Sequence, residues 1–478
     1  MIFSTLEFFL FLIVLLPFYY LIKPRWQWMV LLLASILMLG YLSTTFLLYT
    51  LLLAAVNYSL GIFIHKADIH KKKGIYLFAM YLNIGQLVFF KYINFLLGNL
   101  ASLLGILNTG VEIPYLHIIA PIGISYYTFE FIGYQINVYR GTEDPESHFG
   151  IFASYVLFFP KLLAGPIERS KTFLPKLKTS YSFKPAVFHD GLIQLFWGFF
   201  KKLVIADRLF PMVQNIYGNI DEYSGIPLII TYILQVFHMY CDFSGYTDIM
   251  LGIGKLFGIQ LTNNFERPLL AQNVSMFWRK WHITLSNWCN DYIFKKILLK
   301  RMRWKKWAAV YGVFVSFLII GIWHGAGWTF IMLGLLQGIA INYEFFTKRR
   351  RLQIASRFPS YWVKLLSRTF VFLFFGLTLI FFNAQSLGDA FYFVGHLFTD
   401  VGEKWVGFDM GIPRYDYIIA LTGVGIVYLV DYTNEKGKLV RTKLSKYPAL
   451  KWSLYYGLVL AVLIFGKFAS SDFVYFQF

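Results

Sequence analysis

The sequence is poor in charged residues. Only 14% of its 478 residues are Asp, Glu, Lys or Arg, whereas about a quarter of an ordinary soluble domain is charged. Hydrophobic residues make up 58% of the chain and aromatic residues 20%. Most side chains therefore require hydrocarbon or packed protein around them. This composition excludes a water-soluble globular protein and indicates an integral membrane protein.

Acidic residues are scarcer still, with 25 Asp and Glu against 44 Lys and Arg and a net charge of +19. The basic residues occur between hydrophobic stretches, so we expect no nucleic-acid partner. They follow the positive-inside rule instead, which places basic loops in the cytoplasm. A multi-pass protein of the cell membrane is expected, surrounded by membrane lipids, with residues 383–414 and both termini extracytoplasmic. The basic segments expected in the cytoplasm are 23–25, 66–73, 171–184, 295–306, 348–351 and 436–451.

Cysteine is nearly absent, since only Cys241 and Cys289 occur, both in apolar surroundings. Two isolated thiols predict neither a disulfide framework nor a zinc site. The chain also lacks a Gly-x-Ser-x-Gly elbow, a Walker loop and a His-Glu-x-x-His motif. We therefore expect no metal and no tightly bound cofactor.

Linkers rich in Gly, Ser or Pro are missing, and no repeat recurs at a fixed period, so residues 1–478 are interpreted as a single domain. Long apolar stretches are abundant, and about 20 apolar residues suffice to cross a bilayer. We predict an all-α membrane protein with about 11 transmembrane helices and short interfacial helices, and we expect loops or short interfacial helices at 141–149 and 165–189. More spans are expected between 115 and 210. The clearest stretches are 8–22, 28–50, 75–97, 226–254, 308–323, 328–346, 370–382, 417–430 and 452–468.

One histidine lies between two of these apolar stretches. His324 occurs in Ile-Trp-His-Gly-Ala-Gly-Trp, and the basic segments beyond both neighbouring stretches are expected on the same side. The two stretches thus predict a helical hairpin with His324 at its apex, where nearby glycines allow a tight break. An ionisable residue at such a depth is by default a functional hypothesis. We interpret His324 as a general base, with a structural hydrogen-bonding role as the alternative.

A second histidine, His282, follows Arg279 and Lys280 in a segment rich in tryptophan and basic residues. Such a segment favours the cytoplasmic membrane interface, where it meets anionic lipids. It would also suit an anionic group such as a phosphate or a thioester-bearing donor. His282 is accordingly a candidate catalytic residue, although a structural role fits equally well.

Polar side chains are crowded into the apolar stretch that contains Asp242, Ser244 and Tyr246. Groups so placed normally face the interior of a helix bundle or a wet path. The pattern indicates either a substrate path or hydrogen bonding that stabilises the bundle.

Five segments in order resemble the membrane-bound O-acyltransferase family, over residues 120–344. They are PIGISYYTF from Pro121, FPKLLAGPI from Phe159, DFSGYTDI from Asp242, FWRKWHITLS from Phe277 and IWHGA from Ile322. Within the family the chain is similar to the bacterial branch that contains alginate O-acetyltransferase and the D-alanyl transfer protein of teichoic acid synthesis.

The resemblance implies that His324 is the essential membrane histidine and His282 the second functional histidine. It also implies a central funnel through which an acyl group passes from an inner donor to an outer acceptor. Arg279, Lys280 and Trp323, which flank the two histidines, are the expected donor-binding or substrate-path residues, together with Asp242, Ser244 and Tyr246.

The final residues, SDFVYFQF from Ser471, are similar to aromatic tails of bacterial cell-surface acylation systems. Tyr475 would offer one hydroxyl on an apolar segment that could enter a cavity, receive an acyl group and present it to a partner. An aromatic anchor at the membrane interface is the alternative.

These observations together favour a membrane O-acyltransferase. We expect it to take an acetyl group from acetyl-CoA or another acyl thioester and to deliver it outward for O-acetylation of a cell-envelope or extracellular polysaccharide. Because the chain has almost no external domain, a separate extracytoplasmic transferase is the expected partner. D-alanyl transfer from a cytoplasmic carrier protein toward teichoic acid is one alternative. A transporter or flippase for a lipid-linked sugar is another, although only one interrupted hairpin occurs, without a matching half.

Overall fold

The computed structural model describes residues 5–162, 165–400, 410–435, 447–468 and 473. Over these residues the chain is helical and contains no strand. Nine of the described helices are long and apolar enough to cross a membrane, which confirms the all-α polytopic class. The count of about 11 spans, the interpretation as one domain and the orientation of the termini stay predictions.

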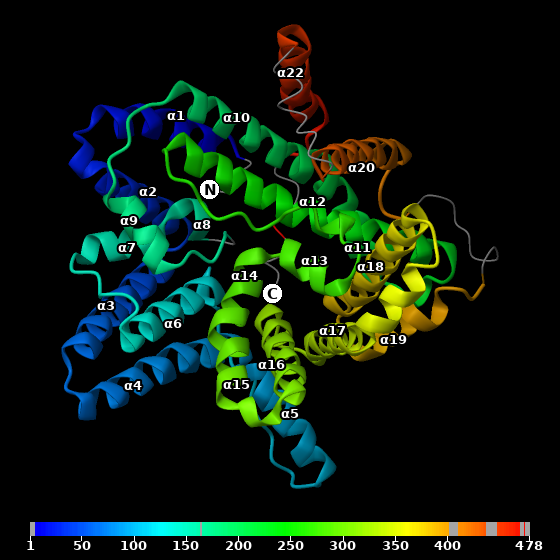
Figure 1. Cartoon of the computed structure of the whole chain (residues 1–478), viewed down its shortest axis with the longest axis horizontal. Helices are drawn as coiled ribbons and strands as arrows, with labels where there is room; N and C mark the ends of the chain where they lie inside the picture. The colour runs from blue at the N-terminus through cyan, green and yellow to red at the C-terminus, as the bar shows by residue number, and fades with distance from the viewer. Residues whose placement is uncertain (1–4, 163–164, 401–409, 436–446, 469–472, 474–478) are drawn as a thin grey trace. The chain divides into compact units, whose positions relative to one another are not determined.

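The chain divides into two compact units. The first comprises Met1–Leu192 and Met250–Thr262, and the second comprises Ile193–Ile249 and Asn263–Phe478. Two helices, α10 (Pro185–Phe199) and α12 (Ile226–Leu256), begin in one unit and end in the other. The other helices of the first unit are α1 (Leu6–Leu21), η1 (Pro24–Trp26), α2 (Gln27–Leu42), α3 (Thr44–Lys66), α4 (Ile69–Leu87), η2 (Val88–Tyr92), α5 (Ile93–Ile106), α6 (Ile124–Arg140), α7 (Phe149–Leu157), α8 (Phe159–Leu162) and α9 (Ser170–Lys178), drawn from blue to cyan in Figure 1.

The stretch 28–50, predicted to be one span, is two helices. Ser43 has an extended backbone with φ −166° and ψ 117°, and its hydroxyl accepts a hydrogen bond from the Phe46 N–H at 3.3 Å. A serine in this position caps the helix that follows it. The chain therefore ends α2 at Leu42 and starts α3 at Thr44, so apolar character alone had merged two helices.

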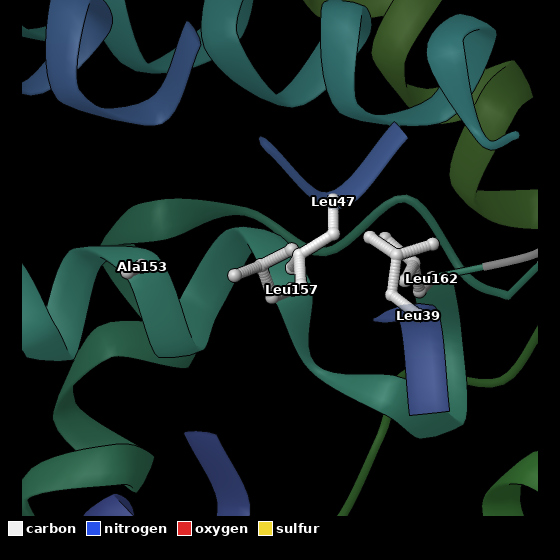
Figure 2. Packing of buried hydrophobic residues seen from close by; sticks show 5 residues of the cluster. All are labelled: Leu39, Leu47, Ala153, Leu157 and Leu162. Carbon is white, nitrogen blue, oxygen red and sulfur yellow. The ribbon is translucent and has the colours of Figure 1, made fainter. Parts of the chain in front are cut away.

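The core of the first unit includes a small aliphatic cluster shown in Figure 2. Leu39, Leu47, Ala153, Leu157 and Leu162 bring α2, α3, α7 and α8 together, and all five are buried. Near the end of α7 the Ser35 hydroxyl, from α2, accepts a hydrogen bond from the Phe159 N–H at 3.0 Å. The short α8 is thus fixed by apolar packing and by buried polar contacts, which include the ion pair of Lys161 with Glu130.

The second unit holds most of the motifs singled out in the sequence. Besides the parts of α10 and α12 that belong to it, its helices are η3 (Phe200–Ala206), α11 (Asp207–Gly218), η4 (Ile220–Glu222), η5 (Pro268–Leu270), α13 (Val274–Lys280), α14 (Ile283–Cys289), η6 (Asn290–Phe294), α15 (Lys295–Lys300), η7 (Met302–Trp304), α16 (Lys306–His324), α17 (Trp328–Ala355), α18 (Ser360–Asn383), α19 (Leu387–His396), α20 (Arg414–Glu435) and α22 (Pro448–Phe465).

The hairpin predicted around His324 is confirmed. Helix α16 ends at His324 and α17 begins four residues later at Trp328. Glycines let the two helices approach closely: a Cβ atom at Gly334 would lie 2.5 Å from the Phe317 carbonyl oxygen, and one at Gly338 would lie 2.9 Å from the Phe314 ring. Small residues of this kind are how membrane helices pack tightly.

Candidate active site

His282 occupies the break between the short helices α13 and α14. Its backbone is left-handed, with φ 42° and ψ 54°, and its side chain is fully buried. A residue other than glycine rarely adopts this conformation, which costs free energy unless the surroundings enforce it. Strain held at a buried histidine is a reason to suspect function.

Helix α13 is held at its start by a carboxylate. Glu344, on α17, accepts hydrogen bonds from the Val274 N–H at 2.6 Å and from the Ser275 N–H at 3.0 Å and hydroxyl at 2.8 Å. The first N–H groups of a helix have no partner within the helix, and a negative charge there is stabilising. Glu344 therefore fixes the start of the helix that leads to His282.

Further polar contacts dock the same segment. The Trp278 indole N–H, on α13, donates to the Gln337 side chain at 2.9 Å, and Gln337 donates in turn to the Thr378 hydroxyl at 3.1 Å. Beyond the break, the Asn264 side-chain oxygen accepts from the Thr284 N–H at 3.1 Å and from its hydroxyl at 2.7 Å. The backbone is thus secured on both sides of His282, which explains how the left-handed residue is held.

The two predicted histidines lie together around Trp323. The His282 and Trp323 ring centroids are 5.7 Å apart, and those of Trp323 and His324 are 5.1 Å apart. His324 is also buried, with its ring 5.7 Å from Phe382. Burial lowers the pKa of the His282 imidazole well below its ordinary value, and the neighbouring His324 lowers that pKa further. This shift of the pKa favours the neutral form of the His282 imidazole.

The predicted polar residues of α12 make buried contacts with η3. Asp242 pairs with Lys202 at 2.7 Å, and the Ser244 hydroxyl accepts a hydrogen bond from the Lys201 ammonium at 3.0 Å. Lys201 also pairs with Asp248, and Lys202 with Asp207 at 2.6 Å. Buried charges are tolerated only in such pairs. Their role as substrate-path residues stays a prediction.

Tyr246 has an aromatic partner from a distant part of the sequence. The Phe473 ring stacks on it with centroids 4.3 Å apart and planes 11° from parallel. Phe473 also lies 5.6 Å from Phe243, whose ring is 4.8 Å from His282. Phe473 is buried, so this residue belongs to the surroundings of His282. Tyr475 itself lies outside the described residues.

The two predicted basic residues of α13 differ in their surroundings. Arg279 is exposed, whereas Lys280 pairs with Glu435 at 3.8 Å, and Glu435 also pairs with Arg368 at 2.6 Å. Beside this pair lies a cavity of about 810 Å³. It is bordered by the start of α18 and the end of α20, and its lining includes Gln272, Ser360, Tyr361, Lys364, Arg368 and Tyr432.

Sequence reasoning missed several residues of this region. Lys201 and Lys202 were not singled out, although two lysines inside an apolar stretch are a signal of buried ion pairs. Phe473 and the left-handed backbone of His282 carry no comparable signal in the sequence. Among the described residues no group of three or more His, Cys, Asp or Glu side chains is arranged to hold a metal ion.

Comparison with known proteins identifies the family of the chain. The family model described as MBOAT, membrane-bound O-acyltransferase family, matches residues 146–384. The probable alginate O-acetylase AlgI of Azotobacter vinelandii is 33% identical over 414 residues, covering 84% of this chain and 78% of the relative. The peptidoglycan O-acetyltransferase of Helicobacter pylori is 33% identical over 363 residues, covering 70% and 66%.

A more distant relative carries another acyl group in its name. The teichoic acid D-alanyltransferase of Bacillus subtilis is 27% identical over 250 residues, covering 48% of this chain and 61% of the relative. All three relatives are named for transfer of an acyl group, which favours an enzyme over the transporter alternative. The chain therefore belongs to the membrane-bound O-acyltransferase family and is an acyltransferase.

Proposed function

We propose that this chain moves an acetyl group from a cytoplasmic thioester across the membrane for O-acetylation of a cell-envelope or extracellular polysaccharide. The observation that carries the proposal is the convergence of His282 and His324, from different elements, on the buried Trp323 ring. The names of the O-acetylase and O-acetyltransferase relatives support acetyl as the transferred group.

The chemistry follows from the buried imidazole of His324. His324 accepts the proton of an attacking hydroxyl as its oxygen forms a bond to the thioester carbonyl carbon. The carbon–sulfur bond then breaks, and the thiolate takes the proton back as the free thiol. An oxygen ester and a thiol result, and the reaction needs no oxidant or metal ion. His282 is the second candidate for holding or moving that proton, because its ring also lies beside Trp323.

The acceptor inside the protein is proposed to be the Tyr475 hydroxyl. Phe473, two residues earlier, is buried against Tyr246 and Phe243 near His282, and this supports a tail that enters the core. The acylated tyrosine would then pass its acyl group to an extracytoplasmic transferase, the proposed partner that acylates the polymer.

The donor is proposed to be acetyl-CoA. The cavity beside Lys364 and Arg368 supports a donor with phosphate groups, since guanidinium and ammonium groups bind phosphate. Arg279 and Lys280 stay candidate donor-binding residues on the adjoining helix.

Transfer of label from acetyl-CoA tests the proposal. Inside-out membrane vesicles carrying the wild type, the Tyr475→Phe variant or no enzyme would receive labelled acetyl-CoA, with the abundance of the protein measured in each. We expect acid-stable, alkali-labile label on the wild type alone. Normal labelling and export of acetyl by Tyr475→Phe would contradict the relay, and absence of label on the wild type would contradict acetyl-CoA as donor.

D-alanyl transfer is the second candidate, favoured by the similarity to the teichoic acid D-alanyltransferase. It needs a D-alanyl thioester on a carrier protein in place of acetyl-CoA. Supplying the same vesicles with labelled D-alanyl carrier protein separates the two donors, because only the correct thioester labels the chain.

A further inference from the structure

Helix α22 packs weakly against the rest of its unit. Only 6% of its apolar stretch is buried within the protein, whereas the buried share of the other described candidate spans ranges from 11% to 67%. Val462 is its one buried residue within the described part of the chain. Side-chain packing along α22 therefore does little to fix where the following segment goes.

A buried cluster of charges lies where α22 ends. The Asp416 carboxylate, at the start of α20, is fully buried and pairs with the Arg208 guanidinium of α11. The same carboxylate pairs with the Lys467 ammonium at 2.5 Å. Arg208 also donates a hydrogen bond to the Phe465 carbonyl oxygen at 2.5 Å, and the Lys467 N–H donates to the Leu203 carbonyl oxygen at 3.1 Å. These contacts join three helices and η3 at a single point.

The cluster is centred on one acidic residue. Two cations share the Asp416 carboxylate, so its removal would leave Arg208 and Lys467 in the protein without that counter-charge. A buried charge that has lost its counter-charge is strongly unfavourable. The ammonium of Lys467 is the more exposed of the two cations, with 29% of its side chain accessible, and it can move to water. Its movement would release the chain at residue 467.

The attachment point is close in sequence to Phe473. Phe473 follows Lys467 by six positions, and a fully extended chain of that length spans at most about 22 Å. A short tether of this kind keeps the Phe473 ring at a high effective concentration near Tyr246. Without the attachment at Lys467, only the weakly packed helix α22 restrains the chain before Phe473. The Phe473 ring then stacks on Tyr246 less often.

We propose that Asp416 is a positioning residue: with Arg208 and Lys467 it clamps the end of α22 so that Phe473 reaches Tyr246 in the surroundings of His282. The consequence for catalysis rests on the proposed acyl relay, since the clamp sets the approach of the segment that contains Tyr475. The clamp itself does not depend on the relay.

Photo-crosslinking measures the position of the tail without any substrate. Replacing the Tyr246 ring by p-azidophenylalanine keeps an aromatic ring at the stacking position and places a photoreactive group beside Phe473. After illumination of membranes, mass spectrometry quantifies the α12 peptide joined to the peptide that contains Phe473. We expect a strong crosslink in the otherwise unchanged chain and a severalfold loss in Asp416→Asn.

Two comparisons separate positioning from general destabilisation. Glu435→Gln removes ion pairs at the other end of α20, the helix that contains Asp416, and should leave the crosslink unchanged. Lys467→Arg keeps a cation beside Asp416 and should retain most of the crosslink. A full crosslink in Asp416→Asn, or equal losses in Asp416→Asn and Glu435→Gln, would overturn the proposal. If the crosslink depends on Asp416 but no acyl group is transferred from any donor, the clamp stands and the proposed function fails.

Discussion

At the scale of single residues, the two histidines are placed by different means. His324 ends a helix, and its position follows from the chain direction of α16 and α17. His282 sits in a left-handed backbone that neighbouring hydrogen bonds enforce. The two residues therefore respond differently to substitution.

Replacing His324 by Ala or Gln should lower acyl transfer by about 10² to 10⁴, the usual contribution of a general base. Gln keeps a polar side chain in the buried position. Loss of acyl transfer in both variants therefore indicates a role of His324 in proton transfer and not in packing. The rate of acyl transfer per folded protein is the measurement. His396→Gln changes a histidine at the end of α19, away from the ring contacts of the site, and should keep the wild-type rate; full activity of His324→Gln would contradict the assignment.

His282 allows backbone strain to be separated from imidazole chemistry. Asn tolerates a left-handed backbone, whereas a β-branched residue does not. We expect His282→Asn to fold with nearly wild-type thermal stability and to lose activity, while His282→Val loses both. Thermal unfolding in detergent together with the transfer assay tests this. Equal destabilisation by Asn and Val would show that the imidazole, and not the backbone, holds this break together.

At the scale of elements, the hairpin of α16 and α17 and the docked helix α13 form the frame of the site. Glu344 and Gln337 both project from α17 to α13, while α16 supplies Trp323 and His324. A shift between α16 and α17 would therefore change the distance between the two histidines.

Substitution of Gly334 tests the close packing of α16 and α17 most directly. A Cβ atom there would lie 2.5 Å from the Phe317 carbonyl oxygen, so Gly334→Ala forces the helices apart. Overpacking of this kind costs about 1–3 kcal/mol, which a lower midpoint of thermal unfolding would report. Gly425→Ala, in α20 with nothing within 4 Å of the added atom, should be neutral or stabilising by up to about 1 kcal/mol. Equal effects of the two substitutions would contradict close packing as the cause.

At the scale of the whole molecule, the distribution of basic residues predicts the orientation. Gln385 precedes α19 in the segment expected outside, and Lys348 lies near the end of α17 in a segment expected in the cytoplasm; both are exposed. A membrane-impermeant maleimide should label Gln385→Cys on intact cells and Lys348→Cys only after permeabilisation. Cys241 and Cys289 are buried, so the parent chain serves as the blank. The reverse labelling pattern would invert the topology and the proposed direction of transfer.

Much of the candidate site could be read from the chain alone because its signals are local. An isolated histidine between two apolar stretches, with basic segments beyond both, determines the hairpin around His324. The run FWRKWHITLS, with tryptophans and basic residues around His282, is likewise a local signal for that candidate. The prediction of a single span over 28–50 was wrong because hydropathy does not detect the helix cap at Ser43. That cap depends on one side-chain hydrogen bond.

The amino-acid sequence by itself determined that the protein is a helical membrane protein, where most spans lie and which two histidines are the candidates for the chemistry, because composition and the order of motifs are properties of the chain. Only the tertiary structure decided that the His282 ring lies beside Trp323, that Glu344 and Asn264 hold the strained backbone at His282, and that Phe473 reaches Tyr246. These contacts join residues from about 20 to more than 200 positions apart. They arise from packing of helices and from pairing of buried charges, which no local pattern of residues encodes.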